Sequence, residues 1–420
     1  MDKFIISGGK ELKGAVLISG AKNSILPIMV ATIIAPGKYR LNNVPKLKDT
    51  FTMKRLLEMV GAKVNFNENV MDIDTSGCNK PVAPYELVKT MRASFYVLGP
   101  FMSRFNYAEV SLPGGCAWGP RPVDFHLEAL EKMGAELELS DGMIITKGKL
   151  TGAEIEFKKS SVGATGNTIM AAVTAKGKTI IRNAAEEPEI AALCIFLNEM
   201  GADIESTGKN EIIINGQNDL HADIEYTVIP DRIEASTFLI AAAITKSNIK
   251  LKCVNPIHMK IVLEYLQLAG MKLDIGHDTI QIIPNNSSIL PVDIKTGIYP
   301  GFPTDVQAQW MALMTQANGS SVITENIYTD RFTHIPELSR FGANIRLDKN
   351  KAILKGSDRL IAAPVMSTDI RASASLILAA LAAKGKSTIS RIYHIDRGYE
   401  NIEKKLSALG AEITREKSIL

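Results

Sequence analysis

Cys116 lies in a stretch from Ser111 to Asp124 that contains three glycines and three prolines. Neither a helix nor a central strand persists through such a stretch, so the sequence predicts a loop that carries a thiol. Arg121 and Asp124 follow within reach, and a thiol beside a guanidinium group suits acid or nucleophile chemistry. The alternative is a connecting loop whose cysteine has no chemical role.

The other three cysteines, Cys78, Cys194 and Cys253, are far apart in the chain. No Cys-x-x-Cys pair occurs, and no histidine flanks a cysteine at the spacing of metal ligands. We therefore expect reduced thiols in a cytoplasmic protein, with neither a metal nor a cofactor. Cys194 falls in an apolar helical pattern and is expected to be a small core residue.

The length and composition are those of a soluble protein with two domains. A chain of 420 residues is too long for a single core. Its 46% hydrophobic residues, 22% charged residues and net charge of +3 give no case for a nucleic-acid or membrane partner. The N-terminus lacks the apolar run of a signal peptide. The most apolar runs, 238–244 and 376–383, are too short to span a membrane.

The elements that position the loop repeat along the chain. A motif of the form Leu-x-x-x-Gly-Ala, followed by alternating apolar residues, recurs about every 70 residues. Each glycine is expected to end an amphipathic surface helix, and the chain then enters a strand and a hairpin. The six glycines are Gly61, Gly134, Gly201, Gly270, Gly342 and Gly410.

Each copy also contains a second helical segment, rich in Ala, Ser, Thr and Met. A helix that is apolar on all sides is a buried one. The predicted buried helices cover residues 21–35, 91–102, 161–175, 234–245, 305–316 and 370–383. The sequence therefore predicts an α/β fold of six units, each with a buried helix, a surface helix and strands between them.

The two ends of the chain are expected to share one unit. The sixth copy stops at Leu420, where its hairpin should form, and residues 4–19 match the missing strands. We therefore expect one domain of three units over residues 20–229. The second domain covers residues 1–19 and 230–420, and its last unit is completed by the N-terminus. A ligand site is expected in a cleft between two such domains.

Four motifs on this repeat resemble those of the UDP-N-acetylglucosamine 1-carboxyvinyltransferase family. They are Ser19-Gly20-Ala21-Lys22-Asn23, Pro113-Gly114-Gly115-Cys116, Arg121-Pro122-Val123-Asp124 and Ser161-Val162-Gly163-Ala164-Thr165. The resemblance implies two lobes, each an inside-out α/β barrel with buried helices and outer sheets. It also implies transfer of the enolpyruvyl group of phosphoenolpyruvate to the 3-hydroxyl of UDP-N-acetylglucosamine, with release of phosphate. This reaction is the first committed step of peptidoglycan synthesis.

Holding phosphoenolpyruvate requires several cations at one place, and helix starts add partial positive charge. For any one arginine, the alternative is a solvated surface charge. The resemblance implies phosphoenolpyruvate contacts from Lys22, Asn23, Arg121, Arg331, Arg371 and Arg397. It implies UDP-sugar contacts from Arg92, Arg121, Pro122, Val123, Asp124, Phe125, Lys159, Ser160, Ser161, Val162, Asp305 and Ile327.

Three of these residues, together with Cys116, carry the expected catalysis. The implied catalytic residues are Cys116, Asp305, Lys22 and Arg397. From sequence alone Asp305 is equally well explained by the capping of a buried helix, with Thr304 or Asp305 itself as the N-cap. Asp369 stands at the equivalent place in the sixth unit and is expected to be an auxiliary carboxylate that orients Arg371.

Two other functions remain as alternatives. One is 5-enolpyruvylshikimate-3-phosphate synthase, a relative that needs no loop cysteine. The other is a catalytically inactive sugar-nucleotide sensor, which the set of candidate residues disfavours. Trp118 stands where the family usually has isoleucine, and its effect on the loop cannot be read from the sequence. The oligomeric state cannot be read from it either.

Overall fold

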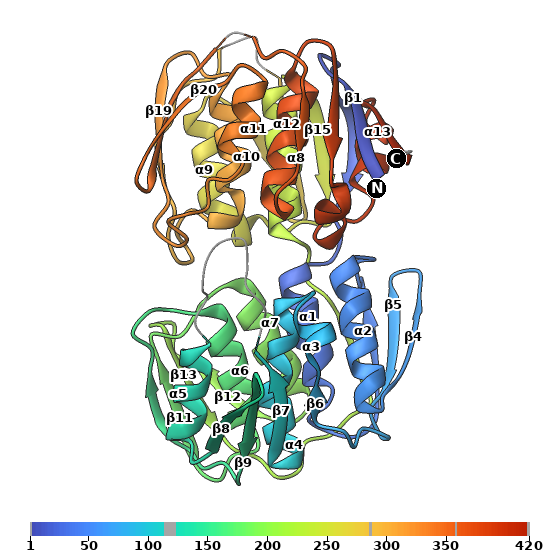
Figure 1. Cartoon of the computed structure of the whole chain (residues 1–420), viewed down its shortest axis with the longest axis vertical. Helices are drawn as coiled ribbons and strands as arrows, with labels where there is room; N and C mark the ends of the chain where they lie inside the picture. Colours follow the sequence, from blue (N-terminus) through green and yellow to red (C-terminus); the bar gives the residue numbers. More distant parts are fainter. Residues whose placement is uncertain (1, 113–122, 285–287, 358, 418–420) are drawn as a thin grey trace. The chain divides into compact units, whose positions relative to one another are not determined.

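The computed structural model describes residues 2–112, 123–284, 288–357 and 359–417. By its internal contacts the chain divides into two compact units (Figure 1). Unit 1 comprises Met1–Ser19 and Pro230–Leu420, and unit 2 comprises Gly20–Ile229. Each unit has its own hydrophobic core.

Unit 2 contains three four-stranded sheets in the described part of the chain. In each, one parallel pair adjoins an antiparallel hairpin. The strand orders are β14 (Ile224–Thr227), β3 (Lys38–Asn42), β5 (Val70–Asp74), β4 (Lys63–Asn67); β6 (Val82–Ala83), β7 (Tyr107–Ser111), β9 (Met143–Lys147), β8 (Glu136–Ser140); and β10 (Glu154–Glu156), β11 (Lys178–Arg182), β13 (Glu211–Asn215), β12 (Asp203–Ser206).

Unit 1 repeats this arrangement with three further sheets among the described residues. Their orders are β16 (Lys272–Ile275), β17 (Thr279–Ile283), β15 (Asn248–Lys252), β2 (Lys13–Leu17); β18 (Ile294–Lys295), β19 (Ser320–Thr324), β21 (Lys351–Lys355), β20 (Asn344–Asp348); and β22 (Pro364–Met366), β23 (Lys386–Ser390), β1 (Asp2–Ser7), β24 (Glu412–Lys417). Strand β1 lies antiparallel between β23 and β24, so the first and last strands of the chain pair directly.

The helices alternate between a buried and a surface type. In unit 2 they are α1 (Lys22–Ala31), α2 (Lys48–Val60), α3 (Tyr85–Val88), η1 (Arg92–Val97), α4 (Leu98–Phe105), α5 (Asp124–Lys132), α6 (Val162–Ala172) and α7 (Pro188–Glu199). In unit 1 they are α8 (Arg232–Ile244), η2 (Pro256–Met259), α9 (Lys260–Leu268), η3 (Thr304–Val306), α10 (Gln307–Met314), α11 (Ile335–Arg340), α12 (Ile370–Ala382), η4 (Ile392–Arg397) and α13 (Ile402–Ala408).

The predicted buried helices are confirmed. Every residue of α10 is buried, and α8, α10 and α12 pack on one another inside unit 1. Small and apolar side chains allow this because no face of such a helix needs water. Strands around them alternate buried and exposed side chains, as β3 does, so the sheets form the outer layer of each unit.

The sixfold repeat is also confirmed by backbone geometry. All six glycines of the repeated motif have positive φ, between 88° at Gly342 and 113° at Gly61. This left-handed conformation ends a helix, and glycine adopts it without the steric penalty of a Cβ atom.

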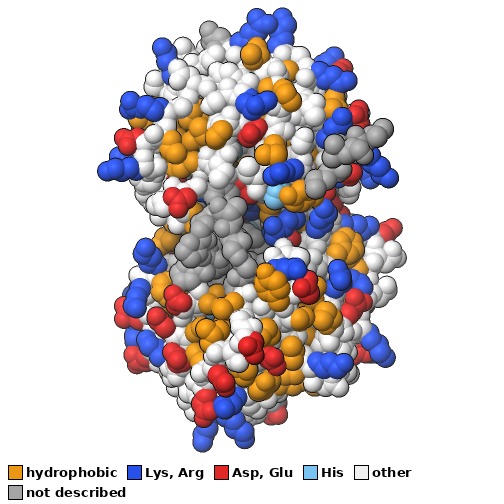
Figure 2. Space-filling view, in the orientation of Figure 1, with side chains coloured by type: hydrophobic (Ala, Val, Ile, Leu, Met, Phe, Trp, Pro, Cys, Tyr) orange, Lys and Arg blue, Asp and Glu red, His pale blue; other side chains and the backbone are white. Residues whose placement is uncertain are grey.

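The visible surface carries charges of both signs, interspersed over each unit, with scattered hydrophobic side chains between them (Figure 2). In the part of the chain that the structure describes, none of the helices combines the length and apolarity that crossing a bilayer requires.

We predict that Gly342→Ala lowers the free energy of unfolding by about 1 kcal/mol. An added Cβ would make an ordinary van der Waals contact with Ile361 Cγ1 at 3.7 Å, so the cost comes from the positive φ alone. Urea unfolding measures it. Gly342→Asn should lose less, because asparagine tolerates this conformation better. Equal losses for both variants would contradict this explanation.

Candidate active site

Asp305 of η3 lies between two guanidinium groups in unit 1. Its Oδ1 is 2.9 Å from an Nη of Arg331, and its Oδ2 is 2.9 Å from an Nη of Arg371. The arginine side chains are 9% and 8% exposed, whereas that of Asp305 is 26% exposed. The structure thus brings together three predicted site residues whose positions span 66 residues of sequence.

Electrostatics fix the charge state of this cluster. Burial by itself would raise the pKa of Asp305, but Arg371 and Arg331 outweigh it and hold that pKa well below its usual value. Burial likewise opposes the charge on Arg371, and Asp305 reverses the effect, so the pKa of Arg371 is raised. The carboxylate is therefore ionised at neutral pH and can accept a proton or a hydrogen bond.

The capping explanation of Asp305 is wrong. Helix η3 begins after Pro303 and α10 after Val306, and neither has a side-chain cap. The carboxylate of Asp305 is drawn away from the helix end because two buried guanidinium groups are its stronger partners.

Asp369, by contrast, is a helix cap. Its Oδ1 accepts hydrogen bonds from the backbone N–H groups of Arg371 and Ala372, at 2.8 and 3.2 Å. It thereby fixes the first turn of α12 and the point from which the Arg371 side chain starts.

Sequence reasoning missed Glu325, which organises the loop before Arg331. Glu325 is fully buried and accepts hydrogen bonds from the hydroxyl groups of Thr296 at 2.8 Å and Thr304 at 2.9 Å. It also accepts from the backbone N–H of Ile327 at 2.8 Å. Thr304 in turn accepts from Arg331 at 3.0 Å. The predicted residue Ile327 is therefore held in the same hydrogen-bonded loop as Arg331.

Arg397 is the last residue of η4, which packs against α12, and its side chain is half-buried. The structure places it on an element adjoining the helix that carries Arg371.

In unit 2, Lys22 begins α1 and its ammonium group lies 2.8 Å from Oδ2 of Asp49. The side chains are 12% and 4% exposed, so this ion pair is largely removed from water. Asp49 belongs to the first turn of α2, where nothing in the sequence distinguishes it from a surface carboxylate. Asn23 follows Lys22 in the first turn of α1.

Apart from Arg92, the predicted sugar-nucleotide residues of unit 2 that the structure describes lie where α5 and α6 begin. Val123 precedes α5, which starts with Asp124 and Phe125, and Ser161 caps α6 by accepting from the N–H of Ala164 at 3.3 Å. The two first turns touch, since a Cβ at Gly163 would lie 3.2 Å from His126 Nε2. Val162 begins α6, preceded by the exposed Lys159 and the half-buried Ser160.

A buried amide, also missed from the sequence, joins these helix starts. Asn167 of α6 accepts a hydrogen bond from the Gly99 N–H at 2.6 Å and donates to the Phe95 carbonyl at 3.0 Å. Its Nδ2 lies 2.9 Å from Nδ1 of His126, which must therefore be the acceptor. The neutral ring then carries its proton on Nε2, facing Gly163.

Other predicted residues cannot be placed. Cys116, Arg121 and Pro122 lie outside the described residues, and Trp118 lies there with them. Arg92 begins η1, and the structure does not describe its side chain. Among the described residues, no group of three or more His, Cys, Asp or Glu side chains is arranged to hold a metal ion.

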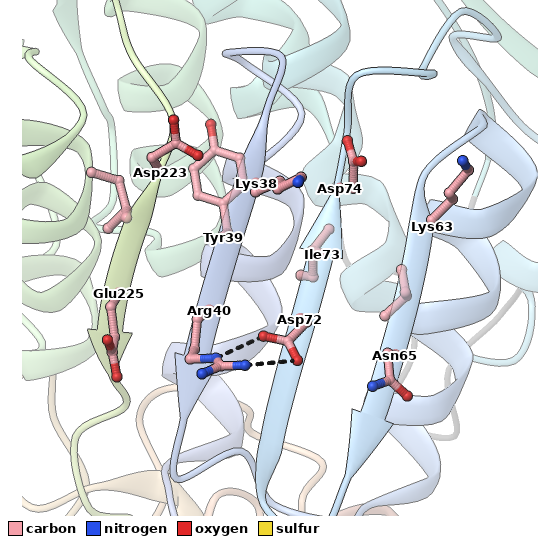
Figure 3. A pocket seen from close by; sticks show the side chains of 12 residues that line it. Lys38, Tyr39, Arg40, Lys63, Asn65, Asp72, Ile73, Asp74, Asp223 and Glu225 are labelled. Carbon is pink, nitrogen blue, oxygen red and sulfur yellow. Dashed lines mark hydrogen bonds and ion pairs between the residues drawn. The ribbon is translucent and has the colours of Figure 1, made fainter.

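A groove of about 660 Å³ in unit 2 lies on the outer face of the sheet containing β3 and β5, and its lining contains none of the predicted site residues (Figure 3). Its charged side chains include Lys38 and Lys63, and Arg40 pairs with Asp72 at 2.8 Å across it. Cations and carboxylates alternate here on an open sheet face. The groove therefore lacks the converging buried cations of the Asp305 cluster.

Comparisons with known proteins agree on one family. The sequence model of the EPSP synthase (3-phosphoshikimate 1-carboxyvinyltransferase) family matches residues 6–406. Proteins named UDP-N-acetylglucosamine 1-carboxyvinyltransferase from Chlorobium luteolum and Chlorobium limicola are 52% and 53% identical over 99% of both chains.

Solved structures agree with these sequence matches. The enolpyruvyl transferase NikO from Streptomyces tendae has a TM-score of 0.91 at 25% identity, covering 100% of this chain and 99% of that one. EPSP synthase from Acinetobacter baumannii shares the fold, with a TM-score of 0.75 at 19% identity over 99% of this chain and 100% of that one. The chain belongs to the EPSP synthase family, and its inside-out α/β fold is that of the family.

We predict that Asp305→Asn lowers the stability of unit 1 at pH 7 by roughly 2–4 kcal/mol, because two buried guanidinium groups lose their shared counter-charge. The folded pKa of Asp305 is depressed, so its contribution is present above the unfolded pKa of about 3.9 and is lost as pH falls toward the folded pKa. The difference between wild type and variant should therefore shrink below about pH 4.

Unfolding of unit 1 can be followed separately by the fluorescence of Trp310, which is fully buried there. The chain has two tryptophans, so a Trp118→Phe background removes the other signal. A stability difference that stays constant from pH 7 to pH 3 would mean that the pKa of Asp305 is the same in the folded and the unfolded protein, and would contradict a depressed folded pKa.

Proposed function

We propose that this protein transfers the enolpyruvyl group of phosphoenolpyruvate to the 3-hydroxyl of UDP-N-acetylglucosamine and releases phosphate. The observation that carries this proposal is identity of 52–53% with relatives of that name over 99% of both chains. The reaction commits UDP-N-acetylglucosamine to peptidoglycan synthesis. The protein acts in the cytoplasm on these two small molecules.

Phosphoenolpyruvate is bound by cationic side chains and one amide. Lys22 and Asn23 begin α1, and Arg331 and Arg371 flank Asp305. Arg397 and Arg121 complete this set of residues. Buried guanidinium groups suit the task because their N–H groups form charge-assisted hydrogen bonds with carboxylate and phosphate oxygens, and few waters compete for them.

The resemblance to the family assigns contacts with the sugar nucleotide to twelve residues. These residues are Arg92, Arg121, Pro122, Val123, Asp124, Phe125, Lys159, Ser160, Ser161, Val162, Asp305 and Ile327. The contact between the first turns of α5 and α6 supports this assignment, because it gathers two sequence-distant segments in unit 2.

The chemistry is an addition followed by an elimination. In the addition, the sugar 3-oxygen bonds to C2 of phosphoenolpyruvate, its proton passes to Asp305, and Cys116 delivers a proton to C3. In the elimination, C3 loses a proton, the double bond re-forms and the C2–O bond to phosphate breaks.

Release of inorganic phosphate tests the proposal directly. Purified protein with phosphoenolpyruvate should release phosphate when UDP-N-acetylglucosamine is added and none when it is omitted. Turnover with shikimate 3-phosphate in its place would identify a 5-enolpyruvylshikimate-3-phosphate synthase instead. No turnover with either acceptor would favour an inactive sensor.

Asp49→Asn should raise the KM for phosphoenolpyruvate about tenfold, because the ammonium group of Lys22 loses the carboxylate that holds it. Initial rates at varied phosphoenolpyruvate measure this change. The matched control is Asp72→Asn, which breaks an exposed ion pair of equal length with Arg40 in the same unit. Its kinetics should be those of wild type, and an equal rise in KM there would argue against a specific role for Asp49.

Cys116→Asp should retain turnover with a lower pH optimum and should resist the epoxide fosfomycin, because a carboxyl group carries a proton but attacks epoxides poorly. Cys116→Ser should be severely impaired, since a hydroxyl is a much weaker acid than a thiol. Turnover rates of wild type and both variants, measured from pH 5 to pH 9, test these two expectations. Wild-type rates for Cys116→Ser across that range would exclude the acid role.

A measurement of the alkylation of Cys116 by the epoxide needs a control for the other three thiols. Burial raises the pKa of Cys78, and it raises that of Cys194 to about 12, so both are poor nucleophiles. Cys253 is exposed, so it should be replaced by serine before labelling is measured.

A further inference from the structure

A buried hydrogen-bonded group lies behind the Asp305 cluster, where the three core helices of unit 1 meet. Tyr399, just after η4, is 2% exposed, and its hydroxyl oxygen lies 2.8 Å from Oγ1 of Thr237 in α8. Gln309 of α10 directs its amide nitrogen toward the same two oxygens, at 3.3 Å from each. These three residues join α8, α10 and the segment after η4.

The same group contacts both members of the Asp305–Arg371 pair. The amide nitrogen of Gln309 also donates to the backbone carbonyl of Asp305, at 2.9 Å. The guanidinium carbon of Arg371 lies 6.0 Å from the centre of the Tyr399 ring, within reach of a cation–π interaction. One tyrosine is thus linked to the backbone of the carboxylate residue and to the side chain of its arginine partner.

Packing alone does not explain polar groups at this place. Tyr399 belongs to the hydrophobic core cluster of unit 1, whose other members are apolar side chains. Moreover, Oε1 of Gln309 has no hydrogen-bond partner among the described residues, which is costly in a core. Burial raises the pKa of Tyr399, so its hydroxyl keeps its proton and can donate.

We propose that Tyr399 is a positioning residue for phosphoenolpyruvate binding, which supports Arg371 through its ring and Asp305 through Gln309. This inference rests on the proposed function, in which the cluster binds the anionic substrate. Losing the Tyr399 hydroxyl frees Gln309 and Thr237 to find other partners. The backbone of Asp305, and with it the guanidinium of Arg371, then shifts relative to the substrate anion.

Tyr399→Phe, which keeps the ring and removes the hydroxyl, tests the inference. The KM for phosphoenolpyruvate should rise at least about fivefold, whereas the KM for UDP-N-acetylglucosamine should stay within about twofold. Tyr39→Phe is the matched control, because Tyr39 is also 2% exposed and its hydroxyl donates to the Ala35 carbonyl at 2.7 Å in unit 2. It should lose stability without a change in either KM.

Thr237 supplies a second route if Tyr399→Phe does not fold. Thr237→Val removes the hydroxyl partner of Tyr399 and should raise the KM for phosphoenolpyruvate. Thr237→Ser keeps a hydroxyl at this position and should leave that KM near the wild-type value. Unchanged kinetics in Tyr399→Phe or in Thr237→Val would overturn the inference, as would an equal rise in Tyr39→Phe. If wild type itself releases no phosphate, the proposed function fails, whatever these variants do.

Discussion

A buried charge is stable in a protein when an opposite charge lies beside it, and the candidate active site depends on this condition. Asp305 compensates the nearly buried guanidinium groups of Arg331 and Arg371, and Asp49 compensates Lys22 in the other unit. These ion pairs fix the direction of the cationic side chains. For the proposed binding of phosphoenolpyruvate, such preformed donors lower the cost of reorganisation.

The rest of unit 1 keeps this cluster in place. Asp369 caps α12 and so sets where Arg371 begins, Glu325 holds the loop that leads to Arg331, and Gln309 ties the backbone of Asp305 to α10. Each tether joins a different element of the repeat. In the inside-out arrangement, polar groups lie at the ends of buried helices. Residues from several elements can therefore hold the cluster around the carboxylate of Asp305.

Much of the fold could be predicted from sequence because its signals are local. Gly342 and its five counterparts predict helix ends, because glycine adopts the left-handed conformation easily. The apolar segments predict buried helices. Site residues with long-range partners could not be found this way. In the sequence, Asp49, Glu325 and Tyr399 cannot be distinguished from ordinary surface or core residues, because their hydrogen-bond and ion-pair partners are distant along the chain. The sequence of Asp305 and its neighbours fits a helix cap as well as a site residue. Its ion pairs with Arg331 and Arg371 in the folded structure distinguish the two roles.

A crystal structure of the Cys116→Ser variant with phosphoenolpyruvate and UDP-N-acetylglucosamine tests the role of the Asp305 cluster most directly. Carboxylate or phosphate oxygens of phosphoenolpyruvate should lie within hydrogen-bond distance of Arg331 and Arg371. Phosphoenolpyruvate bound elsewhere, for example between Lys38 and Lys63 in the outer groove, with both guanidinium groups bound to Asp305 alone, would contradict it.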